Sequence, residues 1–205
     1  MIVFLDTSHD LDQAAEELGG DIPVRQLFTP LTGRLPQRPD EEFAIDNGAF
    51  SRFDEKAYRA LLQRNKPRRN LCRFVAVPDV VGSARRTLEC FDHWRRLLKG
   101  WPLALVAQDG IEDLPIPWHS IEAVFIGGST TWKMSPHAQQ VIRCAQVFGK
   151  WIHVGRVNTP GRFEYFDKLG AHSFDGTGLA RYSWMRERIA ARAEAPDLGL
   201  EEARA

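Results

Sequence analysis

Cysteine is scarce in this sequence, and the three cysteines lie far apart. Cys72, Cys90 and Cys144 form none of the C-x-C or C-x-x-C pairs that are typical of zinc sites. The six histidines are scattered as well. We therefore expect no metal ion and no cofactor. An odd number of cysteines without a secretion signal indicates reduced and mostly buried thiols.

Long apolar segments are missing too. No run approaches the roughly 20 residues that a transmembrane helix needs. Residues 1–5 are apolar, but Asp6 ends the run, and the basic start of a signal peptide is lacking. This segment is predicted to be a first strand. We expect a cytoplasmic protein that does not associate with membranes.

Neither sign of charge predominates. The chain carries 27 Lys and Arg against 27 Asp and Glu, so its formal net charge is zero and no global attraction to nucleic acid follows. Basic residues do cluster within 64–69, 85–99 and 181–192. Each cluster suits a solvated helix face as well as a phosphate-binding surface. Arginine outnumbers lysine, which favours bidentate phosphate contacts, although a GC-rich genome gives the same bias.

Short apolar segments recur along the chain. Several lack polar alternation, which is typical of strands buried on both faces of a parallel sheet. The predicted strands are Ile2–Leu5, Val24–Phe28, Phe43–Ile45, Phe74–Val77, Leu103–Ala107, Ala123–Ile126, Trp151–Val154 and His172–Phe174.

Helical patterns with recognisable ends lie between these strands. Serine or threonine before proline favours a helix start, and glycine just past the last turn favours its end. The predicted helices are Asp54–Gln63, one capped by Ser83 that runs to Gly100, one opened by Ser135-Pro136, one from Thr159-Pro160 to Gly170, and Arg181–Ala193.

Alternating strands and helices predict an α/β fold with a parallel sheet. Eight strands favour a compact (β/α)8 TIM-type barrel, with residues 1–195 as a single domain and 196–205 as a polar C-terminal tail. Within region 6–42 the first crossover is short and rich in Pro and Gly, so one barrel element there is expected to be missing or irregular. The alternative is an open doubly wound sheet. It would normally carry a Gly-rich loop after the first strand, where this chain has Asp6-Thr7-Ser8-His9.

Polar and glycine residues follow most of the predicted strands. In a barrel, these strand ends line the active site. Taken singly, each has a structural explanation as a turn or cap residue, but their recurrence in one ring favours a functional site. The segments are 46–50, 78–82, 107–110, 127–130, 155–158 and 174–178.

This ordered set resembles the tRNA-guanine transglycosylase (queuine/archaeosine tRNA-ribosyltransferase) superfamily, and most of all its relatives that insert 7-deazaguanines into DNA. Residues 46–50, Asp-Asn-Gly-Ala-Phe, resemble the family's Asp-Ser-Gly-Gly-Phe motif. Residues 106–110 resemble its Val-Gln-Gly-Gly segment. The most specific stretch is 155–160 followed by 170–175, which resembles Gly-Val-Gly-Thr-Pro and Gly-x-Asp-x-Phe-Asp. The resemblance covers residues 43–178.

The chain departs from the family in three ways. It lacks the clustered Cys and His of the zinc subdomain, it is much shorter than the tRNA enzymes, and residues 176–181 replace the family's usual continuation. The resemblance therefore implies a reduced relative, without the zinc subdomain, that acts on DNA or on a nucleoside-sized substrate.

The resemblance also implies roles for individual residues. Asp175 would be the nucleophile that attacks C1′ of the nucleoside, and Asp46 the general acid and base. Asp79 and Gln108 would bind the edge of the base. Backbone N–H groups of Gly127 and Gly128 would add donors, because glycine lets the backbone approach a ligand closely.

Further contacts with the nucleic acid are expected around this centre. Phe50 and Trp132 either sandwich the base or belong to the core. Lys133, Arg156 and Arg181 lie near strand ends and are predicted to contact phosphates or nucleic acid. In a duplex, the target base would have to flip out of the stack.

The implied activity is a guanine transglycosylase reaction, in which guanine in DNA or RNA is exchanged for a 7-deazaguanine of the preQ0 or preQ1 type. The partners would be DNA or tRNA and the free base, and a helper protein for nucleic-acid binding stays open. Three alternatives remain: an N-glycosidase of nucleosides or modified bases, a non-catalytic barrel that binds nucleobases or nucleic acid, and an unrelated barrel lyase or isomerase that binds phosphate at 127–130.

Overall fold

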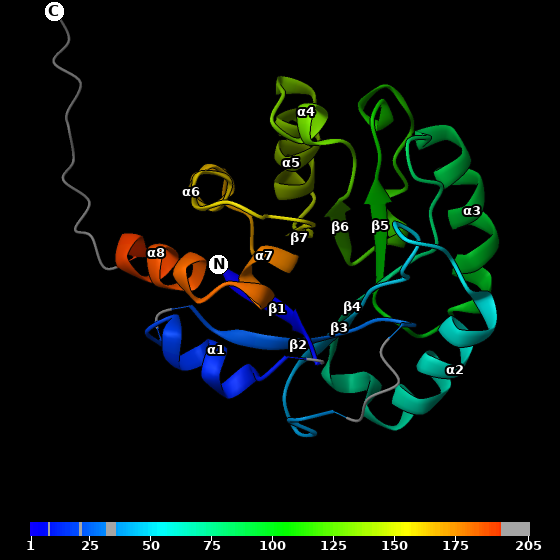
Figure 1. The fold of residues 1–205 in the computed structure, drawn as a ribbon. Helices are drawn as coiled ribbons and strands as arrows, with labels where there is room; N and C mark the ends of the chain where they lie inside the picture. The colour runs from blue at the N-terminus through cyan, green and yellow to red at the C-terminus, as the bar shows by residue number, and fades with distance from the viewer. Residues whose placement is uncertain (8, 21, 32–35, 194–205) are drawn as a thin grey trace, which may run out of the picture.

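In the computed structural model, eight parallel strands close into a barrel, with helices around the outside (Figure 1). The structure describes residues 1–7, 9–20, 22–31 and 36–193. The first strand pairs with the second and also, in parallel, with the last. This closure confirms the predicted α/β barrel of the (β/α)8 TIM type and excludes the open doubly wound sheet, whose first and last strands do not meet. The predicted tail 196–205 lies outside the described residues.

The eight strands coincide closely with the predicted apolar segments. They are β1 (Ile2–Asp6), β2 (Val24–Phe28), β3 (Phe43–Ile45), β4 (Cys72–Ala76), β5 (Leu103–Ala107), β6 (Ala123–Ile126), β7 (Trp151–Val154) and β8 (Ser173–Phe174). The helices are α1 (Leu11–Glu17), α2 (Glu55–Asn65), α3 (Ala84–Leu97), α4 (Thr130–Lys133), α5 (Pro136–Val147), α6 (Pro160–Lys168), α7 (Thr177–Arg181) and α8 (Ser183–Ala193), with short 3-10 helices at Lys66–Leu71, Ile111–Asp113 and Trp118–Ser120.

Side-chain caps explain where several helices begin. Asp54 accepts a hydrogen bond from the N–H of Ala57, and Thr159 accepts one from the N–H of Arg162. Pro160 occupies the first turn of α6, where its missing N–H costs nothing. The last predicted helix, Arg181–Ala193, corresponds to α8, and a separate short helix, α7, precedes it and ends at Arg181.

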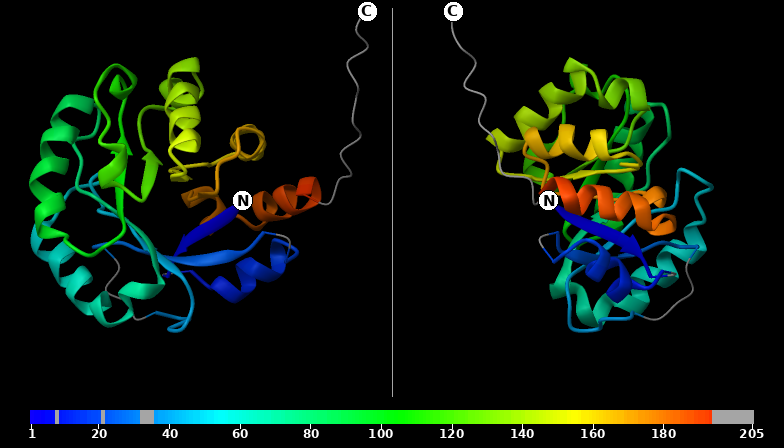
Figure 2. Two further views of the ribbon diagram at one scale, coloured as in Figure 1. Left: turned by 180° about the vertical axis from the view of Figure 1, so that it is seen from behind. Right: turned by 60° about the vertical axis from the view of Figure 1, so that its left-hand side comes forward.

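The expected irregularity in region 6–42 is present. Helix α1 is only seven residues long, and the described part of the β2–β3 connection contains no helix. Helix α8 packs beside α1, although the two lie at opposite ends of the chain (Figure 2). The Arg186 Nε to Glu17 Oε2 distance is 2.6 Å, so a largely buried ion pair joins them.

Apolar side chains form one layer between barrel and helices and a second layer inside the barrel. Phe4, Phe74 and Phe125 fill the barrel's middle and are at most 8% exposed. They form the floor beneath the strand ends. The three cysteines are free, with Cys72 buried and the other two partly buried. Within the described ranges, no helix is long and apolar enough to span a bilayer.

Candidate functional site

A pocket of about 600 Å³ opens at the carboxyl ends of the barrel strands, which is the active-site face of TIM barrels. Its volume suits a small ligand such as a nucleobase or nucleoside. Every strand contributes a residue at or just beyond its end: Asp6, Thr29, Asp46, Asp79, Gln108, Gly127, Arg156 and Asp175. The ring predicted from the strand ends is therefore assembled in space.

Asp175 follows β8 and is held by two hydrogen bonds. Its Oδ1 accepts from the backbone N–H of Arg156 at 2.9 Å, and its Oδ2 lies 3.0 Å from Nε2 of His153. The two oxygens of the Asp175 side chain therefore have different partners, which fixes the orientation of the carboxyl group. Arg156 has a φ of 61°, a left-handed conformation that costs a non-glycine residue about 1–2 kcal/mol. The turn that presents its N–H to Asp175 is therefore a strained one.

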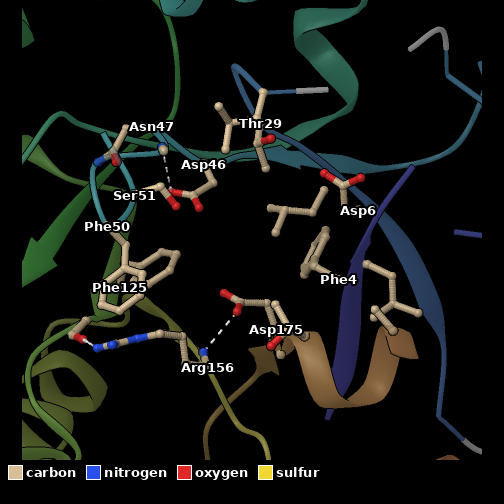
Figure 3. A pocket seen from close by; sticks show the side chains of 18 of the residues that line it. Phe4, Asp6, Thr29, Asp46, Asn47, Phe50, Ser51, Phe125, Arg156 and Asp175 are labelled. Atoms are coloured by element: carbon tan, nitrogen blue, oxygen red, sulfur yellow. Dashed lines mark hydrogen bonds between the residues drawn. The ribbon is translucent and has the colours of Figure 1, made fainter. Parts of the chain in front are cut away.

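Asp46 follows β3 and enters the pocket from the side opposite Asp175 (Figure 3). Burial raises the pKa of Asp46 to about 7, and the negative charge of Asp175 contributes to that rise. A hydrogen bond from the N–H of Gly48 opposes the shift only in part. The pocket therefore contains one acid, Asp175, that is held by two hydrogen bonds, and a second, Asp46, that carries a proton for part of the time near neutral pH.

Asp79 is a third acid in the pocket, and two side-chain amides donate hydrogen bonds to it. Its Oδ1 accepts from Nδ2 of Asn47 at 2.8 Å, and its Oδ2 accepts from Nε2 of Gln108 at 2.7 Å. Burial raises the pKa of Asp79, and these two donors oppose that rise. Gln108 also accepts from the N–H of Gly82 at 3.0 Å. Gln108 was predicted to contact a base, and the structure shows it bonded to Asp79, which it orients.

The two glycines after β6 do not offer their N–H groups to a ligand. Both N–H groups donate to the carbonyl of Ala107 at 3.0 Å, so the predicted donation to a base is not seen. Their carbonyl oxygens accept from Nη2 of Arg156 at 2.6 and 2.7 Å. Glycine is nevertheless required. A Cβ on Gly127 would lie 2.6 Å from Val106, and a Cβ on Gly128 would lie 2.3 Å from Asp109. Of the two, only Gly127 lines the pocket.

Phe50 stands at the pocket rim, with 64% of its surface exposed. The guanidinium of Arg156 lies 4.1 Å from the centre of its ring, a cation–π contact. Arg156 is thus tied to the pocket wall through its contacts with Phe50, Gly127 and Gly128. Trp132, the other aromatic residue considered for stacking, belongs to the core. It is buried, does not line the pocket, and donates to Glu112.

The three predicted phosphate contacts differ in their placement. Arg181 is exposed and lines the pocket, and Arg156 lies in the pocket wall. Lys133 is only 2% exposed, and its Nζ donates to the carbonyl of Gly155. Burial, followed by the charge of Arg156, lowers the pKa of Lys133 to about 8. The position of Lys133 does not fit a phosphate contact, because its ammonium group is buried and is bonded to the backbone of the turn that precedes Arg156.

Several residues of the site were not among the predicted ones, and Asn47, Asp6, Thr29 and His153 are the most informative of them. Asn47 follows Asp46 directly, so its place at a strand end was a usable signal. Asp6 and Thr29 also line the pocket (Figure 3), and Asp6 is the last residue of the first strand. His153 lies within an apolar strand, and no local signal in the sequence marks it.

Neither metal-ligand grouping nor comparison with known proteins identifies the function of this pocket. Among the residues that the structure describes, no three His, Cys, Asp or Glu side chains are grouped to hold a metal ion. No protein-family model matches the chain, and no curated protein matches it.

Proposed function

We propose that this protein is a guanine transglycosylase-like enzyme that exchanges guanine in DNA or RNA for a 7-deazaguanine base, through a covalent bond between Asp175 and the sugar. The observation that supports this most is the pair of carboxyl groups in one pocket. Each oxygen of Asp175 is held by a hydrogen-bond partner, whereas burial and the charge of Asp175 raise the pKa of Asp46 to about 7. Two carboxyl groups with separated roles are what acid-assisted glycosyl transfer requires.

In the first half-reaction, a carboxylate oxygen of Asp175 attacks C1′ of the target nucleotide. The bond between C1′ and N9 of guanine breaks, and its electron pair leaves with the base. The proton that Asp46 carries passes to the departing guanine. The products are free guanine, a glycosyl ester on Asp175 and the carboxylate of Asp46.

In the second half-reaction, N9 of the incoming 7-deazaguanine attacks the same carbon. The ester bond breaks, its electron pair returns to Asp175, and the proton lost from N9 of the incoming base goes to Asp46. Both acids are then in their starting states. No water and no redox partner is consumed.

The polar group around Asp79 suits recognition of a guanine-like edge. Guanine and 7-deazaguanine both present N–H groups at N1 and N2, and a carboxylate is the natural acceptor for such a pair. Asn47 and Gln108 hold Asp79 in place. The exposed ring of Phe50 at the rim offers a surface on which the base can stack.

The experiment is a trapping assay with guanine-containing DNA or tRNA and a free 7-deazaguanine such as preQ0 or preQ1. We expect release of guanine, and an adduct that survives denaturation when the second base is withheld. Asp175→Asn should abolish both. Asp113→Asn is the matched control, because Asp113 is exposed and lies outside the pocket lining.

Other outcomes separate the competing functions. Guanine released in stoichiometric excess over the base incorporated, with an abasic sugar left behind, would mean that water replaces the incoming base and that the enzyme is an N-glycosidase. Binding of bases or nucleic acid without release, unchanged in Asp175→Asn, would mean a non-catalytic barrel. Binding of phosphate sugars at 127–130 with indifference to nucleobases would mean an unrelated lyase or isomerase.

A further inference from the structure

A histidine lies in the middle of the otherwise aromatic barrel interior. His153, on β7, is completely buried. The centre of its ring lies 4.5 Å from that of Phe125, 4.8 Å from that of Phe74 and 5.9 Å from that of Phe4. A leucine or phenylalanine would fill this position without burying two polar nitrogens, each of which needs a partner.

Both ring nitrogens of His153 do have partners, and these form one chain through the barrel. The indole Nε1 of Trp151 donates to Oγ of Ser173 at 2.7 Å. Oγ of Ser173 lies 2.9 Å from Nδ1 of His153, and Nε2 of His153 lies 3.0 Å from Oδ2 of Asp175. Trp151 and His153 belong to β7, whereas Ser173 lies in β8 and Asp175 directly follows it; the two strands are neighbours in the barrel. This series of hydrogen bonds therefore runs from Trp151, at the amino-terminal end of β7, to Asp175 in the pocket.

Donor and acceptor chemistry gives this chain a direction. An indole N–H can only donate, so Ser173 accepts from Trp151 and keeps its own proton for Nδ1 of His153. In the neutral ring, the remaining proton then sits on Nε2 and faces Asp175. A protonated ring also carries a proton on Nε2, so the carboxylate meets a donor in either state.

We propose that His153 is a positioning residue for Asp175, which it orients and holds ready for attack through the chain that begins at Trp151. This inference rests on the proposed function, since it assigns a role within that reaction. With the N–H of Arg156 on Oδ1 and His153 on Oδ2, neither oxygen can rotate away. Each oxygen still has a lone pair free to approach C1′.

His153 and the N–H of Arg156 both act on Asp175 in each half-reaction. While one oxygen of Asp175 is bonded to the sugar, the donor on the other oxygen polarises the ester carbonyl. When the ester breaks, the donors receive the returning negative charge, which makes Asp175 a better leaving group. Hydrogen bonds to an ionised acceptor are the stronger kind, and here His153 is completely buried and held in place by its own partners.

The test compares His153→Leu with His153→Gln in single-turnover adduct formation. Leucine fits the aromatic cage but has no donor, whereas the amide nitrogen of glutamine reaches about as far as Nε2 of histidine. We expect leucine to slow adduct formation by about 10- to 100-fold with little change in KM, because a misplaced nucleophile loses rate without losing substrate affinity. Glutamine should restore at least part of the rate. A purely structural role predicts no difference between the two variants.

A second measurement does not depend on activity. In the wild type labelled with ¹⁵N-histidine, one-bond N–H coupling should place a proton on Nε2 of His153, and that proton should exchange slowly with solvent. A proton on Nδ1 alone would overturn the inference, and this spectrum decides the question if His153→Leu fails to fold. Full activity in His153→Leu alongside an inactive Asp175→Asn would overturn the inference and leave the proposed function standing. An active Asp175→Asn would overturn both.

Discussion

Asp46 and Asp175 lie close enough in one pocket for the charge of Asp175 to raise the pKa of Asp46. The two charges repel each other, and this repulsion favours the protonated form of Asp46. The coupling also changes during the proposed reaction. Formation of the ester removes the charge on Asp175, which favours the carboxylate of Asp46 at the moment when that acid has given up its proton.

This relationship predicts that Asp175→Asn lowers the pKa of Asp46. The substitution keeps the size of the side chain and removes the charge that raises the pKa towards 7, while burial continues to raise it. Titration of the Asp46 carboxyl carbon by ¹³C NMR in the two proteins measures the difference. An unchanged titration midpoint would mean that burial alone sets the pKa of Asp46.

The first half-reaction is predicted to fail at alkaline pH. Asp46 is the proton donor, and its raised pKa means that the protonated form predominates below about pH 7 and is lost above it. We expect adduct formation to be fastest below pH 7 and to fall about tenfold per unit well above it. Single-turnover rates between pH 5 and 9 give the profile. A flat profile would remove Asp46 from the acid role.

Asp46→Asn is predicted to stabilise the fold at alkaline pH while abolishing acid catalysis. A raised pKa in the folded state means that ionisation of Asp46 weakens folding progressively as the pH rises from about 4 through about 7. Asparagine does not ionise and keeps the oxygen that accepts from Gly48. Thermal unfolding at pH 8 should show a higher Tm for the variant, at roughly 2–4 °C per kcal/mol, and at pH 4 the difference should vanish.

Gly128→Ala is predicted to destabilise the protein, because the new methyl group would overlap with Asp109 and with the buried side chain of Trp132. A Cβ there would lie 2.3 Å from Oδ1 of Asp109 and 2.6 Å from Cε3 of Trp132. Overpacking of this kind costs about 1–3 kcal/mol. Gly161→Ala is the matched control, since Gly161 is exposed in α6 with no atom within 4 Å of its Cβ position. Denaturant unfolding should show a loss for Gly128→Ala and none for Gly161→Ala.

The strands could be predicted from the sequence because strands buried on both faces form continuous apolar runs. Three helices escaped prediction. Helices α1, α4 and α7 have seven, four and five residues, too few for a helical period to stand out. Single-sequence patterns also contain no information on which strand pairs with which, and barrel closure follows from that pairing.

The site was predictable to the extent that it depends on strand ends. Asp46, Asp79 and Asp175 come together because each follows a strand of one parallel barrel. The partners of polar groups could not be predicted in the same way. The N–H groups of Gly127 and Gly128 donate to the carbonyl of Ala107, and His153 contacts Asp175 at the end of the neighbouring strand. Both contacts join segments that are separated in the sequence.

The contrasting positions of Lys133 and Arg181 lead to opposite predictions for their variants. Arg181 is exposed at the pocket edge, so Arg181→Ala should weaken binding of a guanine-containing oligonucleotide and reduce the slope of log Kd against log salt by about 1, as expected for one lost phosphate contact. Lys133 is buried and bonded to Gly155, so Lys133→Met should leave that slope unchanged. Lys133→Met should instead lower the Tm and slow adduct formation, because the turn that presents the N–H of Arg156 to Asp175 loses its hydrogen bond from Lys133.

Binding titrations by fluorescence anisotropy at several salt concentrations, together with thermal unfolding, separate the two effects. A reduced salt slope in Lys133→Met with an unchanged Tm would mean that Lys133 leaves its buried position to meet a phosphate when nucleic acid binds.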